Sequence, residues 1–212
     1  MHSGSRGLGK KIMDQHIAEN GSVGLPENTE RAKQYIEKHN EAVRWAKLNR
    51  EVIADRFMKC LNMSGTRILD ICHNSVEKKT FSDGRYWLHR KGAAPSDKGL
   101  VVIPGSRGAT TYLVKPTSVQ ELSNFSLAHG AGRKHKRHDM EKRLKDKHSA
   151  KSLTYTSLGS RVICENKKLL YEEAPEAYKD IDQVVKDLEA MGLIRLIARF
   201  KPLITYKTRK ES

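Results

Sequence analysis

The sequence is poor in the features that mark exported, zinc-stapled or membrane-spanning proteins. Its 212 residues include only three cysteines, Cys60, Cys72 and Cys164, which are too few and too scattered for a disulfide framework. No C-x-x-C pair suggests a structural zinc site, and no uninterrupted apolar run is long enough to cross a membrane. The first residues do not resemble a secretory signal peptide. We therefore expect a soluble, cytoplasmic protein with no membrane partner.

Negative charge is also scarce. Lys and Arg number 40 while Asp and Glu number 25, so the formal net charge is +15. Apolar residues make up 37% of the chain, which is enough for a packed core, and we expect a single domain over 1–212. The charge excess favours a polyanionic partner such as nucleic acid, although charge alone leaves open a merely soluble basic protein.

The apolar spacing predicts an α+β fold. Apolar residues at three- and four-residue steps predict a helix over 29–61, and its length leads us to expect a break or two helices. Alternation and β-branched residues predict a strand at 67–73, and the glycines of 4–9 predict a loop. Helices and strands mix without a strict βαβ rhythm. The other expected elements are strands at 86–89, 100–103, 111–114, 125–128 and 193–200, a helix at 180–191 capped by Gly192, and a basic, helix-compatible stretch at 133–151.

Several short segments have the composition of phosphate-binding loops. Glycines beside a serine or a basic residue let backbone N–H groups approach phosphate oxygens, although each such loop taken alone is more often an ordinary turn. None has the Walker A spacing. His129 lies between a predicted strand and a glycine loop, where a histidine could be a nucleophile, a base, a metal ligand or simply hydrogen-bonded. The segments are HSGSRGLG at 2–9, HNSVE at 73–77, RKGA at 90–93, IPGSRG at 103–108 and HGAGR at 129–133.

Taken together and in this order, these segments resemble the RtcB family of RNA ligases. The family's hallmarks are H-x-G-S-R-G-x-G, an H-N-x-V-E-like segment, R-K-G-A, I-P-G-S-x-G and H-G-A-G-R. The likeness continues through EAPEAY at 173–178 and RFKPL at 199–203 to Lys207, and so covers nearly the whole chain. It implies the C-terminal portion of the RtcB-type fold.

The resemblance also implies a specific chemistry. The family uses GTP and manganese to join RNA that ends in a 3′-phosphate or 2′,3′-cyclic phosphate to RNA with a 5′-hydroxyl, in tRNA splicing or RNA repair. By likeness, His129 would attack GTP and carry GMP, and His2 and His73 would be manganese ligands. The positions that match guanylate contacts are His73, Asn74, Pro104, Gly105, Ser106, Arg107, Thr111, His129, Gly130, Ala131, Gly132, Tyr178 and Lys207.

Three arginines are candidates for binding RNA phosphates. The guanidinium group offers paired N–H donors that match phosphate oxygens. The candidates are Arg6 in the first motif and Arg133 and Arg137 in and after the HGAGR segment.

The chain departs from the family pattern in three places. Complete members are roughly twice as long, and their N-terminal half supplies an Asp-x-x-Cys pair and an Asn-x-x-x-His segment that cannot be placed here. We therefore expect the metal site of this chain to be incomplete. The chain would then be a fragment, one half of a split enzyme whose partner chain holds the other ligands, or an inactive remnant. The sequence after His129 reads GRKHKR at 132–137 where the family has G-R-x-x-S-R, and the stretch between His2 and His73 is short. The more basic sequence after His129 resembles a variant bacterial branch associated with RNA repair, and the short stretch leads us to expect that a peripheral element is missing. The alternative function is a noncatalytic, basic RNA-binding protein.

Overall fold

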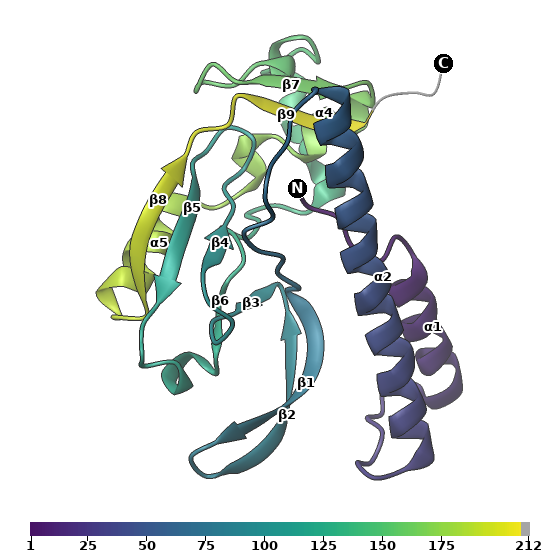
Figure 1. The fold of residues 1–212 in the computed structure, drawn as a ribbon. Helices are drawn as coiled ribbons and strands as arrows, with labels where there is room; N and C mark the ends of the chain where they lie inside the picture. The colour runs from purple at the N-terminus through teal and green to yellow at the C-terminus, as the bar shows by residue number, and fades with distance from the viewer. Residues whose placement is uncertain (209–212) are drawn as a thin grey trace. The chain divides into compact units, whose positions relative to one another are not determined.

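The computed structural model describes residues 1–208, and its backbone contacts divide the chain into two compact units. Unit 1 is Met1–Lys91 and unit 2 is Gly92–Ser212. Helices and short, mostly antiparallel strands are both well represented, so the α+β expectation is confirmed (Figure 1). No helix within the described residues is long and apolar enough to span a membrane.

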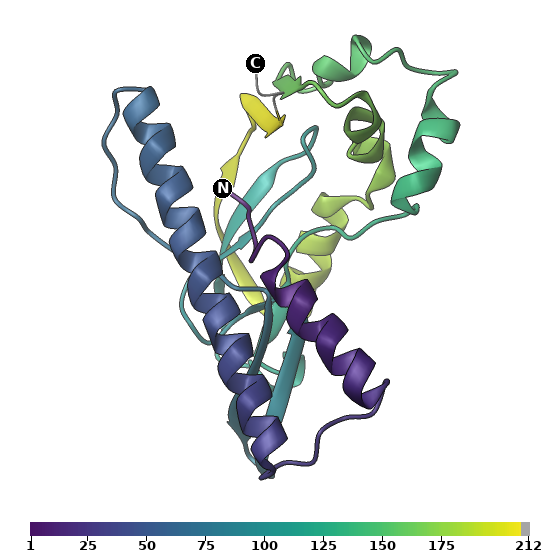
Figure 2. The same cartoon turned by 90° about the vertical axis from the view of Figure 1, so that its right-hand side faces the viewer.

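Unit 1 consists of a helical hairpin and a strand hairpin. Its helices are α1 (Leu8–Asn20) and α2 (Glu30–Cys60), and its strands β1 (Asn74–Phe81) and β2 (Gly84–Lys91) pair antiparallel. Thr29 begins α2 by accepting a hydrogen bond from the backbone N–H of Ala32, at 3.2 Å. The expected break in this helix was wrong, because α2 is one helix of 31 residues. Figure 2 shows that it is continuous. The segment contains neither glycine nor proline, so nothing in it favours a break.

Two other expectations for unit 1 need correction. Residues 67–73 form no strand, and strand pairing begins only at Asn74, opposite Lys91. The alternating pattern was present without a partner strand: Asp70 instead forms an ion pair with Arg50 of α2. The loop expected at 4–9 ends early, because α1 begins at Leu8 after Gly7, whose φ is +103°.

Unit 2 is built from three small sheets. β3 (Ala93–Pro95) pairs with β6 (Ser126–Ala128), and β4 (Val101–Ile103), β5 (Thr111–Pro116) and β8 (Ile194–Phe200) form an antiparallel sheet in the order β4-β5-β8. β7 (Arg161–Cys164) and β9 (Ile204–Thr208) pair in parallel and were not expected from the sequence. The helices are α3 (Met140–Leu144), α4 (Lys167–Glu172), α5 (Ile181–Ala190) and the 3-10 turns η1 (Glu121–Ser123), η2 (Arg137–Asp139), η3 (Ser152–Thr154) and η4 (Pro175–Ala177).

Most sequence expectations for unit 2 are confirmed. The strands expected at 100–103, 111–114, 125–128 and 193–200 correspond to β4, β5, β6 and β8. The helix expected at 180–191 is α5, and in unit 1 the strand expected at 86–89 lies inside β2. The basic stretch at 133–151 is helical only in η2 and α3. Gly192 follows α5 with a φ of +68°, which suits the expected cap.

The apolar core is unevenly distributed between the units. In unit 2, Val101, Ile103 and Val114 of the three-stranded sheet are fully buried, and a second cluster surrounds Met140 and Leu170. Within the described part of unit 1, the buried hydrophobic residues are two alanines of α2, at positions 42 and 46. Unit 2 therefore has the core needed to hold a site rigidly.

Candidate functional site

His129 lies directly after β6, beside the glycine that precedes β3. The pairing of Ala93 with Ala128 places Gly92 next to His129, and the Nδ1 atom of the histidine is hydrogen-bonded to the carbonyl oxygen of Gly92. A carbonyl can only accept, so Nδ1 carries the proton and the ring lone pair is on Nε2. The approach is close: a Cβ atom added to Gly92, whose φ is +68°, would lie 2.9 Å from His129 Cε1.

The IPGSRG loop lies against the loop that follows His129. A Cβ atom added to Gly130 would be 3.2 Å from the carbonyl oxygen of Pro104. Gly105 is held more tightly, because a Cβ atom there would be 2.2 Å from the carbonyl oxygen of Thr110. The backbone N–H of Gly105 donates to the hydroxyl of Thr111, at 3.4 Å. These two glycines let the loops fold closely on themselves and on each other.

The same loops are joined to the EAPEAY segment. A Cβ atom on Gly108 would lie 2.7 Å from Pro175 Cγ, so the IPGSRG loop packs on η4. Arg133 and Tyr178 form an isolated backbone bridge, and backbone bonds run from Lys134 N–H to the Ala177 carbonyl (2.8 Å) and from Lys179 N–H to the Gly132 carbonyl (3.0 Å). Four of the sequence motifs therefore meet within unit 2: RKGA through Gly92, IPGSRG, HGAGR and EAPEAY.

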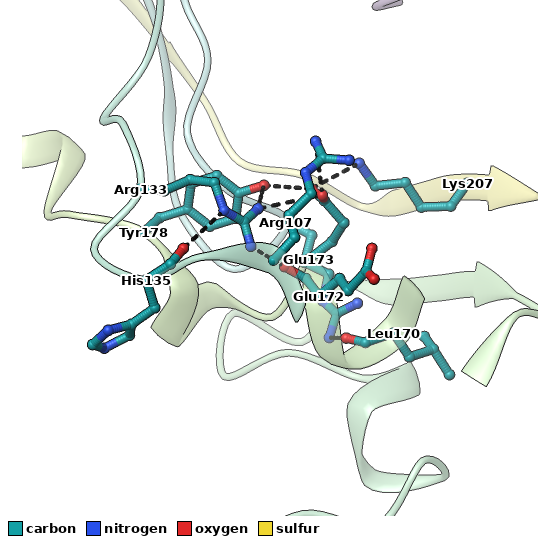
Figure 3. Close-up of polar contacts among 9 residues, drawn as sticks. Arg107, Arg133, His135, Leu170, Glu172, Glu173, Tyr178 and Lys207 are labelled. Carbon is teal, nitrogen blue, oxygen red and sulfur yellow. Dashed lines mark hydrogen bonds and ion pairs between the residues drawn. The ribbon is translucent and has the colours of Figure 1, made fainter. Parts of the chain in front are cut away.

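Figure 3 shows a cluster of charged groups around Glu173, whose side chain is only 10% exposed. Its Oε1 atom lies 3.4 Å from Arg133 Nη1 and 3.3 Å from Arg137 Nη2. Its Oε2 atom accepts a hydrogen bond from the Tyr178 hydroxyl and lies 3.9 Å from the ammonium of Lys207. We call these five residues the Glu173 cluster. Three cations surround one carboxylate, so the cluster carries a net positive charge.

Arg133 is the most constrained cation of the Glu173 cluster. Its Nε donates to the carbonyl of His135 at 3.2 Å and its Nη2 to the carbonyl of Glu172 at 2.5 Å (Figure 3). Its Nη1 also donates to the Tyr178 hydroxyl at 3.0 Å, and the guanidinium carbon stands 4.9 Å from the centre of the Tyr178 ring. Burial, followed by the hydrogen bond to Glu173, raises the pKa of Tyr178 to about 12. The tyrosine is therefore neutral at physiological pH.

Arg107 has a different environment from the other predicted guanylate contacts. Its side chain is buried, and Nη2 donates to the carbonyl of Leu170 at 2.8 Å. Nε and Nη1 have no hydrogen-bond partner among residues 1–208. Burial lowers the pKa of Arg107. Among the described residues, the guanidinium group is therefore held by one hydrogen bond, to the backbone of α4.

In unit 1, a second group of motif residues is brought together by α2. The rings of His2 and His73 are stacked, with centroids 5.1 Å apart. Arg50 of α2 donates from Nη1 to the carbonyl of Ser3 at 3.0 Å and from Nε to Asp70 at 2.6 Å. Arg50 thereby connects Ser3, which follows His2, with Asp70, which lies three positions before His73. Asn49 adds a bond to the hydroxyl of Ser3, at 2.9 Å.

The family assignment comes from comparison with known proteins. The family model for tRNA-splicing ligase RtcB matches residues 1–208. The chain belongs to the RtcB family. It is 49% identical over 207 residues to the RNA-splicing ligase RtcB2 of Escherichia coli, a match that covers 98% of this chain and 54% of the relative.

More distant RtcB proteins match over the same part of the chain. The tRNA-splicing ligase RtcB of Nanoarchaeum equitans is 31% identical over 246 residues, covering 98% of this chain and 51% of the relative. That of Methanocaldococcus jannaschii is 29% identical over 245 residues, covering 96% and 25%. The chain spans about half the length, or less, of the curated relatives it matches. The two archaeal alignments, of 246 and 245 residues, are longer than the RtcB2 alignment of 207 residues.

The predicted RtcB site residues fall in both units. Unit 1 holds His2, His73, Arg6, which is exposed with a φ of +50°, and Asn74, which is exposed at the start of β1. Within residues 1–208, no group of three or more His, Cys, Asp or Glu side chains is arranged so that it could hold a metal ion. The residues that unit 2 holds are Pro104, Gly105, Ser106, Arg107, Thr111, His129, Gly130, Ala131, Gly132, Arg133, Arg137, Tyr178 and Lys207.

Sequence reasoning gave no role to three residues that organise these sites. Gly92 belongs to the RKGA motif and Glu173 to the EAPEAY segment, but only the structure shows what these two residues contact. Arg50 lay within a predicted helix and carried no motif signal. A carboxylate in a strongly basic chain, inside a motif, was the one sequence feature that could have drawn attention to Glu173.

Proposed function

We propose that this chain contains the nucleophile and the guanine-nucleotide pocket of a GTP- and manganese-dependent RNA ligase. The ligase would join RNA with a 3′-phosphate or 2′,3′-cyclic phosphate to RNA with a 5′-hydroxyl, in tRNA splicing or RNA repair. The observation that carries the proposal is the convergence of three glycine-containing loops and the EAPEAY segment around His129, whose Nδ1 bonds to a backbone carbonyl. The names of the relatives, RNA-splicing and tRNA-splicing ligases, support it.

The reaction begins at His129. Its Nε2 lone pair attacks the α-phosphorus of GTP, a nitrogen–phosphorus bond forms, and pyrophosphate leaves with the electrons of the broken bond. The carbonyl of Gly92 stabilises the positive charge that develops on the ring, because it accepts a hydrogen bond from Nδ1. A phosphate oxygen of the RNA 3′ end then takes GMP from His129. The RNA 5′-hydroxyl attacks the 3′-phosphorus, GMP leaves and the hydroxyl proton passes to solvent. A 2′,3′-cyclic phosphate is first opened by water to the 3′-phosphate.

The loops around His129 suit a bound nucleotide. Gly105 and Gly130 let the two loops pack closely beside His129, and Ser106 adds a hydroxyl that a phosphate oxygen could contact. In our proposal the guanine base stacks on Tyr178 and its edge contacts Lys207. Both side chains belong to the Glu173 cluster.

Manganese would be bound in part by His2 and His73. The stacked rings place two imidazoles together, which fits two members of a metal site, and further ligands would come from outside the described residues or from substrate oxygens. When bound, the metal would act as a Lewis acid that withdraws charge from a phosphate group. Arg50 holds the segments that carry both histidines.

RNA phosphates would be bound by the exposed basic groups. The side chain of Arg137 is 63% exposed, whereas the donors of Arg133 are bonded within the protein, so Arg137 suits the role better. Arg6 remains a candidate in unit 1. The proposal includes a cytoplasmic location, where the ligase would act on the ends of cellular RNA.

The test is covalent labelling with GTP that is labelled in its α-phosphate, in the presence of manganese. We expect His129→Ala to abolish the label, and His138→Ala, which changes an exposed histidine paired with Asp139, to leave it unchanged. The assay is run with the chain alone and with the remaining part of a full-length relative supplied as a separate polypeptide. Absence of label from a folded protein in both arms would contradict the proposal and favour a noncatalytic RNA-binding protein.

A further inference from the structure

The proposed chemistry leaves Glu173 without a role, although it is the best-connected carboxylate of the site. Its four partners come from three segments: Arg133 and Arg137 from the stretch after His129, Tyr178 from the end of the EAPEAY segment, and Lys207 from β9. A carboxylate that is 10% exposed needs such partners, because an unpaired charge is strongly disfavoured when it is removed from water.

The contacts of Glu173 fix the orientation of the Tyr178 ring. The hydroxyl donates to Glu173 and accepts from Arg133 Nη1, so the end of the side chain is held at two points. The guanidinium of Arg133 covers one face of the ring, 4.9 Å from its centre (Figure 3). A base that stacks on Tyr178 must therefore use the opposite face, and the ring is already oriented for it.

Lys207 depends on Glu173 in a different way. Its ammonium lies 3.9 Å from Oε2 of Glu173, and its side chain is 36% exposed, so it keeps donors that a ligand can use. The strand that carries it, β9, pairs only with β7 among the described strands. Glu173 is thus the direct connection between the side chain of Lys207 and the ring of Tyr178.

We propose that Glu173 is a positioning residue for guanine recognition, which holds the Tyr178 ring and the Lys207 ammonium so that one base can be stacked and contacted at its edge. This inference rests on the proposed function. Glu173 is not required to close the loop around Arg133, because that arginine is also bonded to the carbonyls of His135 and Glu172. The role is therefore separable from folding.

The test compares Glu173→Gln with Glu172→Gln in the full chain. Glu172 is the adjacent glutamate, and its carboxylate pairs only with Lys168, at 3.9 Å, among the contacts of the described residues. Binding of GTP and of ATP, each with manganese, is measured by calorimetry. We expect Glu173→Gln to weaken GTP binding about tenfold and to reduce the preference for GTP over ATP, because the charged hydrogen bonds to the carboxylate are lost. Glu172→Gln should behave as the wild type.

A spectroscopic measurement separates positioning from a general loss of structure. Burial is the largest cause of the raised pKa of Tyr178, and Glu173 adds to it by accepting a hydrogen bond from the hydroxyl and by repelling the ionised phenol. Glu173→Gln should therefore lower the pKa of Tyr178, observed as tyrosinate absorbance in an alkaline titration. The corresponding step disappears in Tyr178→Phe, which identifies it among the seven tyrosines.

The outcomes are distinct. A folded Glu173→Gln protein that binds GTP with the affinity and selectivity of the wild type overturns the inference and leaves the proposed function standing. A folded wild-type chain that binds no GTP overturns both. If Glu173→Gln does not fold, Glu173→Asp keeps the charge on a shorter side chain, and unchanged selectivity in that variant would equally overturn the inference.

Discussion

The two units bring distant motif residues together by different physical means. In unit 2, strands, backbone bonds and closely packed glycines place His129, Gly130 and Pro104 beside one another over an apolar core. In unit 1, the pair His2 and His73 is connected through the polar side chain of Arg50, on a helix whose buried hydrophobic residues are alanines. We call the bonds of Arg50 to Ser3 and Asp70 the polar clamp. Backbone packing tolerates little displacement, whereas the polar clamp can be loosened without disturbing the fold. The units should therefore respond differently to substitution.

The largest effect is expected for Gly105→Ala in unit 2. The new Cβ atom would lie 2.2 Å from the carbonyl oxygen of Thr110, so the IPGSRG loop must change its backbone path. We expect a loss of about 2–4 kcal/mol of stability and loss of detectable GTP labelling, because overpacking against backbone cannot relax by side-chain rotation. Thermal melting and the labelling assay measure both.

Gly24→Ala is the control for this substitution. Gly24 has open space around its Cβ position and no positive φ, so this change should leave melting and labelling unchanged. If Gly105→Ala melted and labelled like the control, backbone packing would not be what holds the site of unit 2.

A smaller effect is expected for Gly92→Ala, and it should fall on chemistry more than on stability. Its Cβ atom would lie 2.9 Å from His129 Cε1 and would push the ring away from the carbonyl that orients it. Gly99→Ala is the matched control, because Gly99 also has a positive φ, of +97°, but has no atom within 4 Å of its Cβ position. Each alanine should cost about 1–2 kcal/mol in backbone strain.

The two variants should differ in labelling. We expect Gly92→Ala to slow labelling of His129 at least about tenfold beyond Gly99→Ala, since misplacing a reacting group lowers the rate strongly. Equal labelling rates would show that the contact between Gly92 and His129 has no part in orienting the nucleophile.

These comparisons also show what the sequence could and could not predict. The glycine loops were recognisable because only glycine permits such close backbone contacts, and local composition carries that signal. The periodicity of the apolar residues was sufficient to predict helix α5 and strands β4, β5 and β8. The contacts of Glu173 were not predictable, because its partners come from three segments that only the folded chain brings together.

The errors have equally local causes. Alternation at 67–73 indicated a strand, yet a strand requires a partner, and Asp70 bonds to a helix instead. A helix of 31 residues was expected to break on length alone, although it contains no glycine or proline, the two residues that disfavour helix most strongly. The parallel pair β7 and β9 escaped notice because its strands are short and far apart in the sequence.

In unit 1, Arg50→Met tests the polar clamp. The substitution removes the bonds to Ser3 and Asp70 and leaves the Asp70 carboxylate, 18% exposed, without its cation. We expect a loss of about 1–3 kcal/mol of stability and weaker manganese binding, because the segments that carry His2 and His73 separate. Both tryptophans of the chain, at positions 45 and 87, belong to unit 1, so their fluorescence during denaturation reports this unit.

Lys59→Gln is the matched control for Arg50→Met. Its ion pair with Asp55 is exposed on both sides, and such pairs contribute about 0–1 kcal/mol. Manganese binding is followed by paramagnetic resonance, which needs no catalytic turnover. If Arg50→Met bound manganese like the control, the histidine pair would be held by something other than this arginine.

The smallest effect is expected for Thr29→Ala at the start of α2. The substitution removes the hydroxyl that accepts the Ala32 N–H bond, and loss of such a cap costs about 1 kcal/mol. Thr66→Ala, at an exposed position outside any helix or strand, should change stability by less than about 0.5 kcal/mol. Tryptophan fluorescence during urea denaturation distinguishes the two, since Trp45 lies on the capped helix. Because α2 carries Arg50, a loss far above the cap's own value would mean that the helix and the polar clamp unfold as one cooperative element; a loss equal to the control would mean that α2 needs no cap at Thr29.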